Sequence, residues 1–225
     1  MVLSHEPPNP SSSEQHAHIS ISYDSIRYIA AGGSGVVYII DNKRVLKEYS
    51  ESVRCDLERR AFERLQHHPN IVRYLGSTRE GSIILERGKC LRKTLQKSGA
   101  HKIPPRTKLR WLKHAAEGLR HLHNNGVFQA DVECGNMILT TNGFLRILRR
   151  NDRVKSIDFE GCSIDGEVDG EVPTSQYIWF SYRRSAPLVS QQTDIFAYGC
   201  VIYEIITGRP PYHGLEKFTN RSSRG

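Results

Sequence analysis

The chain has 225 residues, which is long enough for one large domain or for two small lobes with a real core. Its composition, with 38% hydrophobic and 25% charged residues and a mean hydropathy of −0.50, is typical of a soluble globular protein. The formal net charge is +8, but the basic residues are scattered, with short pairs such as Arg149-Arg150 and Arg183-Arg184. This pattern favours a solvated basic surface over nucleic-acid binding.

Cysteine usage and hydropathy predict the compartment. The five cysteines are widely spaced and form no Cys-x-x-Cys pair, which predicts free thiols in a reducing compartment and argues against a zinc site. The N-terminus lacks the basic-then-apolar pattern of a secretory signal. The longest nearly apolar run, 195–206, is too short to span a bilayer and contains Glu204. We therefore expect a cytoplasmic protein without a membrane partner, and the nucleus is the alternative compartment.

The first part of the chain is predicted to be rich in strands. Residues 1–22 are rich in Pro, Ser and His with almost no apolar periodicity, which predicts a disordered N-terminal tail. Apolar residues then recur at helical spacing over 52–66, and a His-Pro pair ends that helix. The β-prone segments around this helix are 26–29, 36–40, 45–47, 71–75 and 83–85.

Beyond Gly88 the pattern becomes helical. One apolar stripe runs over 107–124, and short strands are predicted at 137–139 and 155–157. The last helix, 194–207, is apolar on nearly all sides, so it is expected to be buried. The order predicts an α+β fold with two lobes, 23–88 and 89–216, a hinge near 86–88 and a polar tail at 217–225.

Two features of the first lobe carry candidate chemistry. The glycine-rich stretch 30–37 lies between two predicted strands, where backbone N–H groups can close over phosphates, although such hairpins are also plain turns. Lys47 ends an apolar strand, and a buried ammonium needs a partner. Glu58 is the best candidate because it shares a helix face with Leu65. The alternatives are that Glu58 belongs to the charged outer face, or that Glu63 is the partner.

A further pair of motifs gives these features a context. In "VFQADVECGN" (127–136), Asp131 precedes Asn136 by five positions, and "SIDFEG" (156–161) follows. Together with "HPNIV" at 68–72, "TDIFAYG" at 193–199 and "TGRPPY" at 207–212, they resemble a eukaryotic-type protein kinase domain over about residues 23 to 216. The rear half is similar to a divergent group of small kinases abundant in filamentous fungi.

The resemblance implies a bilobal protein-kinase-like fold, ATP and Mg²⁺ as cofactors, and a protein substrate with a Ser or Thr hydroxyl. It makes Lys47 and Glu58 the pair that binds the α- and β-phosphates, and Asp131 the base that accepts the hydroxyl proton. Asn136 and Asp158 would hold Mg²⁺, and Asp194 would brace the catalytic loop unless it only caps its helix. The nucleotide-binding residues implied are Ala30, Gly32, Gly33, Ser34, Gly35, Val37, Lys47, Leu85 as gatekeeper, and Glu86 and Gly88 at the hinge.

Several residues depart from the family pattern. Ala30 replaces the first glycine of the loop, and Gln129-Ala130 replaces a His-Arg pair. Without that arginine, we expect that phosphorylation of Thr174, Ser175 or Tyr177 does not activate the protein. Glu133 stands where Ser/Thr kinases carry a lysine near the γ-phosphate, which is unfavourable by a few kcal/mol at an effective dielectric of about 20 unless it points outward or approaches Mg²⁺. Glu160 replaces the glycine of Asp-Phe-Gly, with Gly161 directly behind it.

Two spacings also depart from the family. Asn136 and Asp158 lie 22 positions apart, against roughly 13 in typical kinases, which predicts an insertion at 142–150, for example a retained intron. The helices that normally complete the rear lobe are missing after residue 216, so we expect a truncated lobe in which helix 194–207 loses part of its packing cover. Two functions stay open: an active Ser/Thr kinase, or a pseudokinase that binds nucleotide with little or no phosphoryl transfer.

Overall fold

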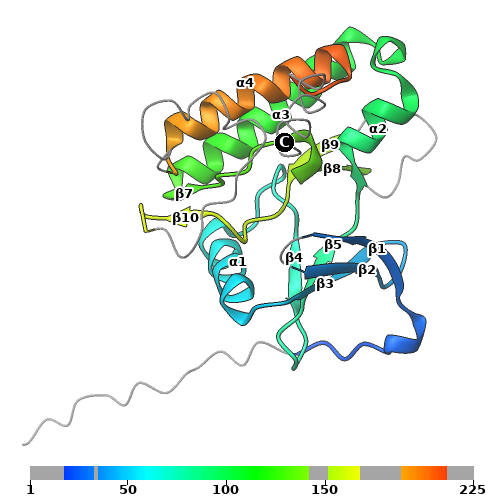
Figure 1. The fold of residues 1–225 in the computed structure, drawn as a ribbon, viewed down its shortest axis with the longest axis vertical. Helices are drawn as coiled ribbons and strands as arrows, with labels where there is room; N and C mark the ends of the chain where they lie inside the picture. Colours follow the sequence, from blue (N-terminus) through cyan, green and yellow to red (C-terminus); the bar gives the residue numbers. More distant parts are fainter. Residues whose placement is uncertain (1–17, 33–34, 142–151, 168–188, 212–225) are drawn as a thin grey trace, which may run out of the picture.

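The computed structural model describes residues 18–32, 35–141, 152–167 and 189–211. The described residues form a sheet-rich lobe and a mainly helical lobe, joined through residues 86–90 (Figure 1). The two-lobed α+β architecture predicted from the sequence is confirmed. The predicted insertion at 142–150 and the three candidate phosphorylation sites lie outside the described residues.

The first lobe is built on one five-stranded antiparallel sheet. In spatial order its strands are β1 (Arg27–Ala31), β2 (Gly35–Ile39), β3 (Arg44–Tyr49), β5 (Ile83–Glu86) and β4 (Tyr74–Ser77). Asp41 fixes the turn between β2 and β3, because its Oδ1 accepts the backbone N–H groups of Lys43 and Arg44 at 2.7 and 2.8 Å. The resulting register aligns Lys47 with Val37 on β2 and with Ile83 on β5.

One helix, α1 (Ser52–Leu65), covers this sheet in the described part of the lobe. Its buried face consists of Cys55, Leu57, Glu58, Ala61, Phe62 and Leu65. The Phe62 ring stacks on Tyr74 of β4 with centroids 5.5 Å apart. The helix predicted over 52–66 is therefore confirmed, and its apolar periodicity sets which side chains face the sheet.

Residues 18–22, the described end of the expected tail, lie beside β4. The Ile19 N–H donates to the Ser77 carbonyl at 2.9 Å, and a short 3-10 turn, Tyr23–Ser25, leads into β1. The strand predicted at 71–75 is displaced to Tyr74–Ser77. Ile71 and Val72 are buried and pair instead with Ser156 of the second lobe, with a Val72 N to Ser156 O distance of 3.0 Å. These two residues therefore join the lobes rather than extend the sheet.

The second lobe contains three helices and several short strands in its described part. The helices are α2 (Leu91–Ser98), α3 (Pro105–Asn124) and α4 (Gln191–Thr207), with 3-10 turns at Ala100–Lys102 and Cys134–Asn136. The strands are β6 (Lys89–Cys90), β7 (Val127–Phe128), β8 (Met137–Thr141), β9 (Asp152–Ser156) and β10 (Ser163–Ile164). The strands predicted at 137–139 and 155–157 pair as the antiparallel hairpin β8–β9.

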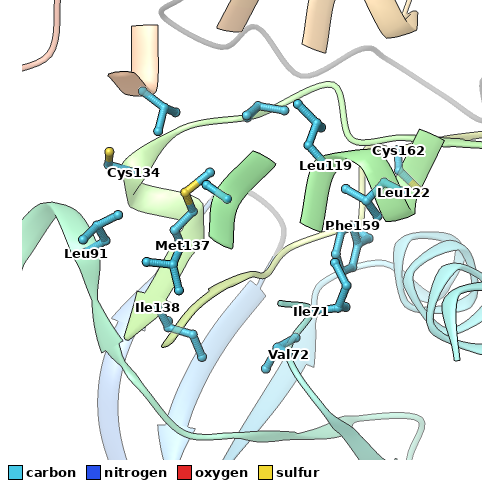
Figure 2. Close-up of a cluster of buried hydrophobic side chains, with 14 of the residues drawn as sticks. Ile71, Val72, Leu91, Leu119, Leu122, Cys134, Met137, Ile138, Phe159 and Cys162 are labelled. Atoms are coloured by element: carbon cyan, nitrogen blue, oxygen red, sulfur yellow. The ribbon is translucent and has the colours of Figure 1, made fainter. Parts of the chain in front are cut away.

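The core of this lobe surrounds the segment that follows β9. Phe159 is fully buried and lies beside Leu122 of α3, Ile71 and Cys162 (Figure 2). Its ring also meets Phe62 of α1 edge-on, with centroids 5.3 Å apart. Burying such a side chain stabilises the fold by about 1.5–3 kcal/mol, so Phe159 fixes the backbone of the residues on either side. The five cysteines are free thiols, as predicted.

Helix α4 differs from its prediction in length and in burial. It begins three residues early because Ser190 and Thr193 form a capping box, each side chain accepting the other's backbone N–H. One face is buried against α3 and the opposite face is exposed, so the burial predicted from its composition holds for one face only. The exposed apolar residues are Ile195, Phe196, Ile202, Tyr203 and Ile206. Within the four described ranges, the helices are too short or too polar to cross a membrane.

Candidate active site

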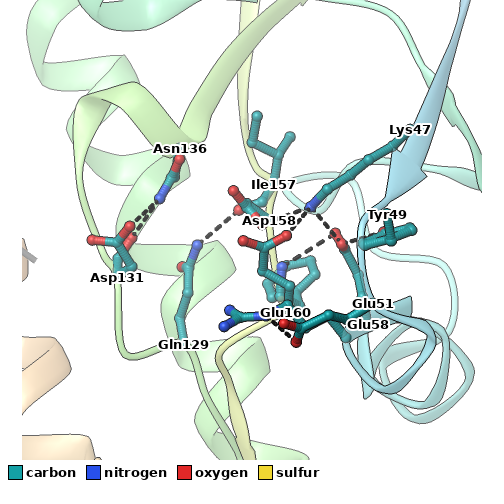
Figure 3. A network of polar contacts seen from close by, with 12 residues as sticks. Lys47, Tyr49, Glu51, Glu58, Gln129, Asp131, Asn136, Ile157, Asp158 and Glu160 are labelled. Carbon is teal, nitrogen blue, oxygen red and sulfur yellow. Dashed lines mark hydrogen bonds and ion pairs between the residues drawn. The ribbon is translucent and has the colours of Figure 1, made fainter. Parts of the chain in front are cut away.

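Lys47 of β3 is the centre of a buried ionic cluster between the lobes (Figure 3). Its Nζ lies 2.7 Å from Glu58 Oε2, 2.8 Å from Asp158 Oδ1 and 2.9 Å from Glu160 Oε2. The Lys47–Glu58 pair expected from the sequence is therefore present. Glu63, the alternative partner, instead pairs with Arg59 on the exposed face of α1.

Glu58 ties three parts of the chain together. Its Oε2 accepts from Lys47 and, at 2.5 Å, from the Tyr49 hydroxyl, and its Oε1 accepts the Phe159 N–H at 3.2 Å. The carboxylate has no exposed surface because its position on α1 lies between buried apolar residues. This arrangement fixes β3, α1 and the segment after β9 relative to one another.

The electrostatics of the cluster favour a charged lysine. Burial alone would lower the pKa of Lys47, but the Glu58, Asp158 and Glu160 carboxylates outweigh it and raise that pKa. Burial raises the pKa of Glu58, against the opposing effect of Lys47. Burial and the Glu58 carboxylate also raise the pKa of Tyr49, so its hydroxyl stays a donor. Three carboxylates around one ammonium leave the site with an excess of acidic groups.

Asp131 and Asn136 lie on the loop between β7 and β8. The Asn136 Nδ2 donates to Asp131 Oδ2 at 2.7 Å and to the Asp131 carbonyl at 3.1 Å. The carbonyl of Asn136 accepts the Ile157 N–H at 3.0 Å, directly before Asp158. This hydrogen bond connects the loop to the segment that carries Asp158 of the Lys47 cluster, and both groups appear in Figure 3.

Asp194, at the start of α4, braces this loop. Its two carboxylate oxygens accept the backbone N–H groups of Gln129 and Ala130 at 2.9 and 3.0 Å, and His123 Nε2 lies 2.9 Å from Oδ2. These bonds hold Ala130 at a φ of 66°, a left-handed conformation that costs a non-glycine residue about 1–3 kcal/mol. The expected bracing is confirmed, whereas the capping side chain of α4 belongs to Ser190.

Comparison with known proteins identifies the family. A family model described as "Protein kinase domain" matches residues 23–224. The chain belongs to the protein kinase family. The family membership and kinase fold predicted from the sequence are therefore confirmed.

Proteins from three different organisms illustrate what this chain is similar to. "Mitogen-activated protein kinase kinase kinase 1" of Arabidopsis thaliana is 26% identical over 87% of the chain and 32% of its own length. "Serine/threonine-protein kinase PknB" of Mycobacterium leprae is 25% identical over 88% of the chain and 34% of its own length. "Cell division control protein 7" of Schizosaccharomyces pombe is 32% identical over 66% of the chain and 14% of its own length. The chain thus spans about a third or less of these relatives.

The residues expected to surround the nucleotide lie along the sheet and the hinge of this kinase. Ala30 and Val37 are register partners on β1 and β2, and the Gly32 N–H donates to the Gly35 carbonyl at 2.9 Å. A Cβ at Gly35 would collide with the Glu48 carbonyl, so only glycine fits there. Gly33 and Ser34 lie outside the described residues.

The expected hinge residues connect the sheet to the second lobe. Leu85 is buried on β5, and Gly88 lies against Ile138 of β8. The Glu86 carboxylate contacts Lys155 Nζ of β9 at 2.5 Å. The backbone N–H of Glu86 donates to the Arg73 carbonyl at 3.0 Å. Glu86 is thus a contact between the lobes as well as a hinge residue of this kinase.

Glu133, the acid where other kinases have a lysine, is directed to Arg92 of α2. Arg92 Nη1 lies 2.9 Å from Glu133 Oε1, and Arg92 Nε lies 2.7 Å from the buried Glu204 Oε1 of α4. A Cβ at Gly135 would collide with the Glu133 carboxylate, so that glycine makes room for the pair. The sequence suggested that Glu133 points outward or approaches Mg²⁺; the structure shows neither, but a largely buried ion pair with an arginine of its own lobe. Sequence reasoning missed Arg92 because α2 itself was not predicted.

Replacing Arg92 with Ala is expected to destabilise the protein by about 3–5 kcal/mol, because it removes a cation from two largely buried carboxylates. The free energy of unfolding in urea measures this. Arg54→Ala is the matched control, because Arg54 pairs with the exposed Glu51 and should change stability by less than about 1 kcal/mol. Equal losses in the two variants would show that the Glu133–Arg92–Glu204 pairs contribute no more than a surface ion pair.

Proposed function

We propose that this chain is an ATP-dependent protein kinase that transfers the γ-phosphate to a Ser or Thr hydroxyl. The observation that carries the proposal is that two groups of side chains are hydrogen-bonded to neighbouring segments. Lys47, Glu58 and Asp158 form one buried network. Asp131 and Asn136 lie on a loop whose Asn136 carbonyl accepts the N–H of Ile157, the residue before Asp158. A phosphate-binding cation and a proton acceptor thus lie on adjoining segments. Phosphoryl transfer requires mainly such positioning and charge neutralisation.

In this proposal each residue has one task. Lys47 binds oxygens of the α- and β-phosphates, and Glu58 holds its ammonium in place. Asp131 accepts the proton of the substrate hydroxyl while that oxygen bonds to the γ-phosphorus and the bond to the β–γ bridging oxygen breaks, releasing ADP. Asn136 orients Asp131 through the 2.7 Å hydrogen bond.

The donor set fits Mg²⁺, which prefers oxygen ligands. Carboxylate oxygens of Glu58, Asp158 and Glu160 lie within 4.8 Å of one another, and there are more acids than cations among them. Asp158 and the Asn136 side-chain oxygen would hold the ion, since the Asn136 nitrogen is directed to Asp131. When bound, Mg²⁺ supplies charge neutralisation at the transferred phosphate.

The contact of Glu160 with Lys47 favours a second candidate, a kinase-fold module that binds nucleotide with little or no transfer. An acid on the lysine opposes phosphate binding there, since a carboxylate and a phosphate both need its positive charge. The protein substrate and a cytoplasmic or nuclear location are also part of the proposal. Nucleic acid is not a proposed partner, because the basic residues are scattered.

The test is transfer of radiolabelled phosphate from Mg·ATP to a generic protein substrate. We expect incorporation by the intact chain and its loss in Asp131→Ala and Lys47→Ala. Stabilisation of the chain by ATP without any transfer would favour the binding module. The absence of both transfer and stabilisation would contradict both candidates.

A further inference from the structure

Glu160 is held beside Lys47 by the backbone on its N-terminal side. Asp158 adopts a φ of 67°, and Phe159 is fully buried with its N–H bonded to Glu58. The Glu160 side chain is therefore directed back into the Lys47 cluster, where it is only 17% exposed. The core packing of Phe159 thus places the backbone of Glu160 beside Lys47, while the Glu160 side chain keeps its own rotamers.

The ammonium of Lys47 is surrounded by carboxylates. It donates hydrogen bonds to Glu58 and Asp158, and the Glu160 carboxylate lies 2.9 Å away as an ion pair. A phosphate oxygen can gain a close contact only by displacing one of them. Glu58 is the hardest to displace, because it also accepts from Tyr49 and Phe159.

Glu160 is held more weakly than Glu58. Its buried Oε2 makes no hydrogen bond in the described part of the chain, and its ion pair there is with Lys47. It also stands between Phe159 and Gly161, so its side chain can turn away while Phe159 stays in the core. A carboxylate and a phosphate would then exchange at the same ammonium.

We infer that Glu160 is an affinity-determining residue, which competes with the phosphate groups of the nucleotide for Lys47. The inference rests on the proposed function and deepens it. It implies that the chain discriminates poorly between ATP and adenosine, because part of the phosphate contribution is offset by Glu160.

The test compares the binding of Mg·ATP and of adenosine to the full chain and to Glu160→Gln by calorimetry. The substitution keeps the shape of the side chain and removes its charge. We expect at least about tenfold tighter binding of Mg·ATP, or about 1.4 kcal/mol, and an unchanged affinity for adenosine, which has no phosphate. Glu80→Gln, on the exposed turn before β5, changes the net charge equally and should alter neither affinity.

A double-mutant cycle with Lys47→Met tests the competition itself. Without the lysine, Glu160→Gln should change the affinity for Mg·ATP by less than about twofold, since the two effects act through one contact. A tenfold gain that persists without Lys47 would overturn the inference in favour of direct repulsion. If Lys47→Met does not fold, the comparison of ATP with adenosine still tests whether Glu160 opposes the binding of the phosphate groups.

Other outcomes separate the inference from the proposed function. Unchanged binding of Mg·ATP to Glu160→Gln, with measurable binding to the full chain, would overturn the inference and leave the proposed function standing. Equal gains for ATP and adenosine would also overturn it, because Glu160 would then act on the shape of the pocket. Failure of every variant to bind either compound would contradict the proposed function and the inference together.

Discussion

Replacing Asp131 with Asn is expected to lower kcat by about 10²- to 10⁴-fold while leaving the affinity for Mg·ATP unchanged. Asn keeps the size of the side chain and can still accept the hydrogen bond from Asn136 Nδ2. What it loses is the ability to accept a proton from the substrate hydroxyl. The effect should therefore appear in the chemical step and not in nucleotide binding.

Steady-state transfer rates and calorimetric ATP binding measure the two parts of this prediction. Asp165→Asn is the matched control, because Asp165 forms an exposed pair with Arg64 outside the catalytic loop. It should change kcat by less than about twofold, as expected for an exposed ion pair of small energy. A kcat for Asp131→Asn within about threefold of the parent would show that Asp131 is not the base.

Replacing Lys47 with Met is expected to destabilise the protein by about 3–5 kcal/mol near neutral pH, because three acids lose their shared cation. ATP-induced stabilisation should be smaller in the same variant. Lys155→Met is the control: Lys155 is also buried, but its ion-pair partner in the described part of the chain is the single acid Glu86. Lys155→Met should therefore lose less stability than Lys47→Met.

The loss in Lys47→Met should depend on pH. Burial raises the pKa of Glu58 above its value in the unfolded chain, and removing the lysine that opposes this shift raises it further. A carboxyl with a raised folded-state pKa takes up a proton on folding, so stability falls as pH rises from the unfolded pKa through the folded one. The deficit should therefore be larger at about pH 8 than at about pH 5.5. Equal deficits in urea unfolding at both values would contradict this electrostatic explanation.

The sequence predicted those parts of the site that depend on local periodicity. Glu58 could be placed facing Lys47 because both lie on elements with a clear apolar face, a strand with period two and a helix with period 3.6. The Asp131–Asn136 pair could be predicted from its five-residue spacing together with the family resemblance, and the hydrogen bonds from Asn136 Nδ2 to Asp131 agree with it. The bracing by Asp194 came from the family resemblance, and the hydrogen bonds to Gln129 and Ala130 agree with it.

The remaining parts depend on contacts that no local pattern encodes. Helix α2 was not predicted because its eight residues carry only Leu91 and Leu95 as an apolar signal, and tertiary packing decides such short helices. Without α2, the pairing of Glu133 with Arg92 could not be anticipated. The direction of Glu160 depends on the left-handed backbone at Asp158, which follows from the burial of Phe159 between the two lobes.

The exposed face of α4 shows a different limit. Apolar residues on nearly every side of 194–207 indicated burial, but burial needs a neighbour on each side as well as an apolar surface. In the described part of the chain, α3 covers one face, while Phe196, Tyr203 and Ile206 remain exposed on the other. The pattern thus predicted that the helix favours burial, but it did not predict which of its faces has a neighbour to pack against.

The most direct test of the central claim is mass spectrometric detection of phosphate on a generic protein substrate after incubation with the chain and Mg·ATP. The proposed kinase predicts phosphate on Ser or Thr residues of the substrate with the intact chain. It predicts a loss of that phosphate with Asp131→Asn, although this variant still binds ATP. Equal phosphorylation by both proteins, or none by an intact chain that binds ATP, would contradict the proposed phosphoryl transfer at this site.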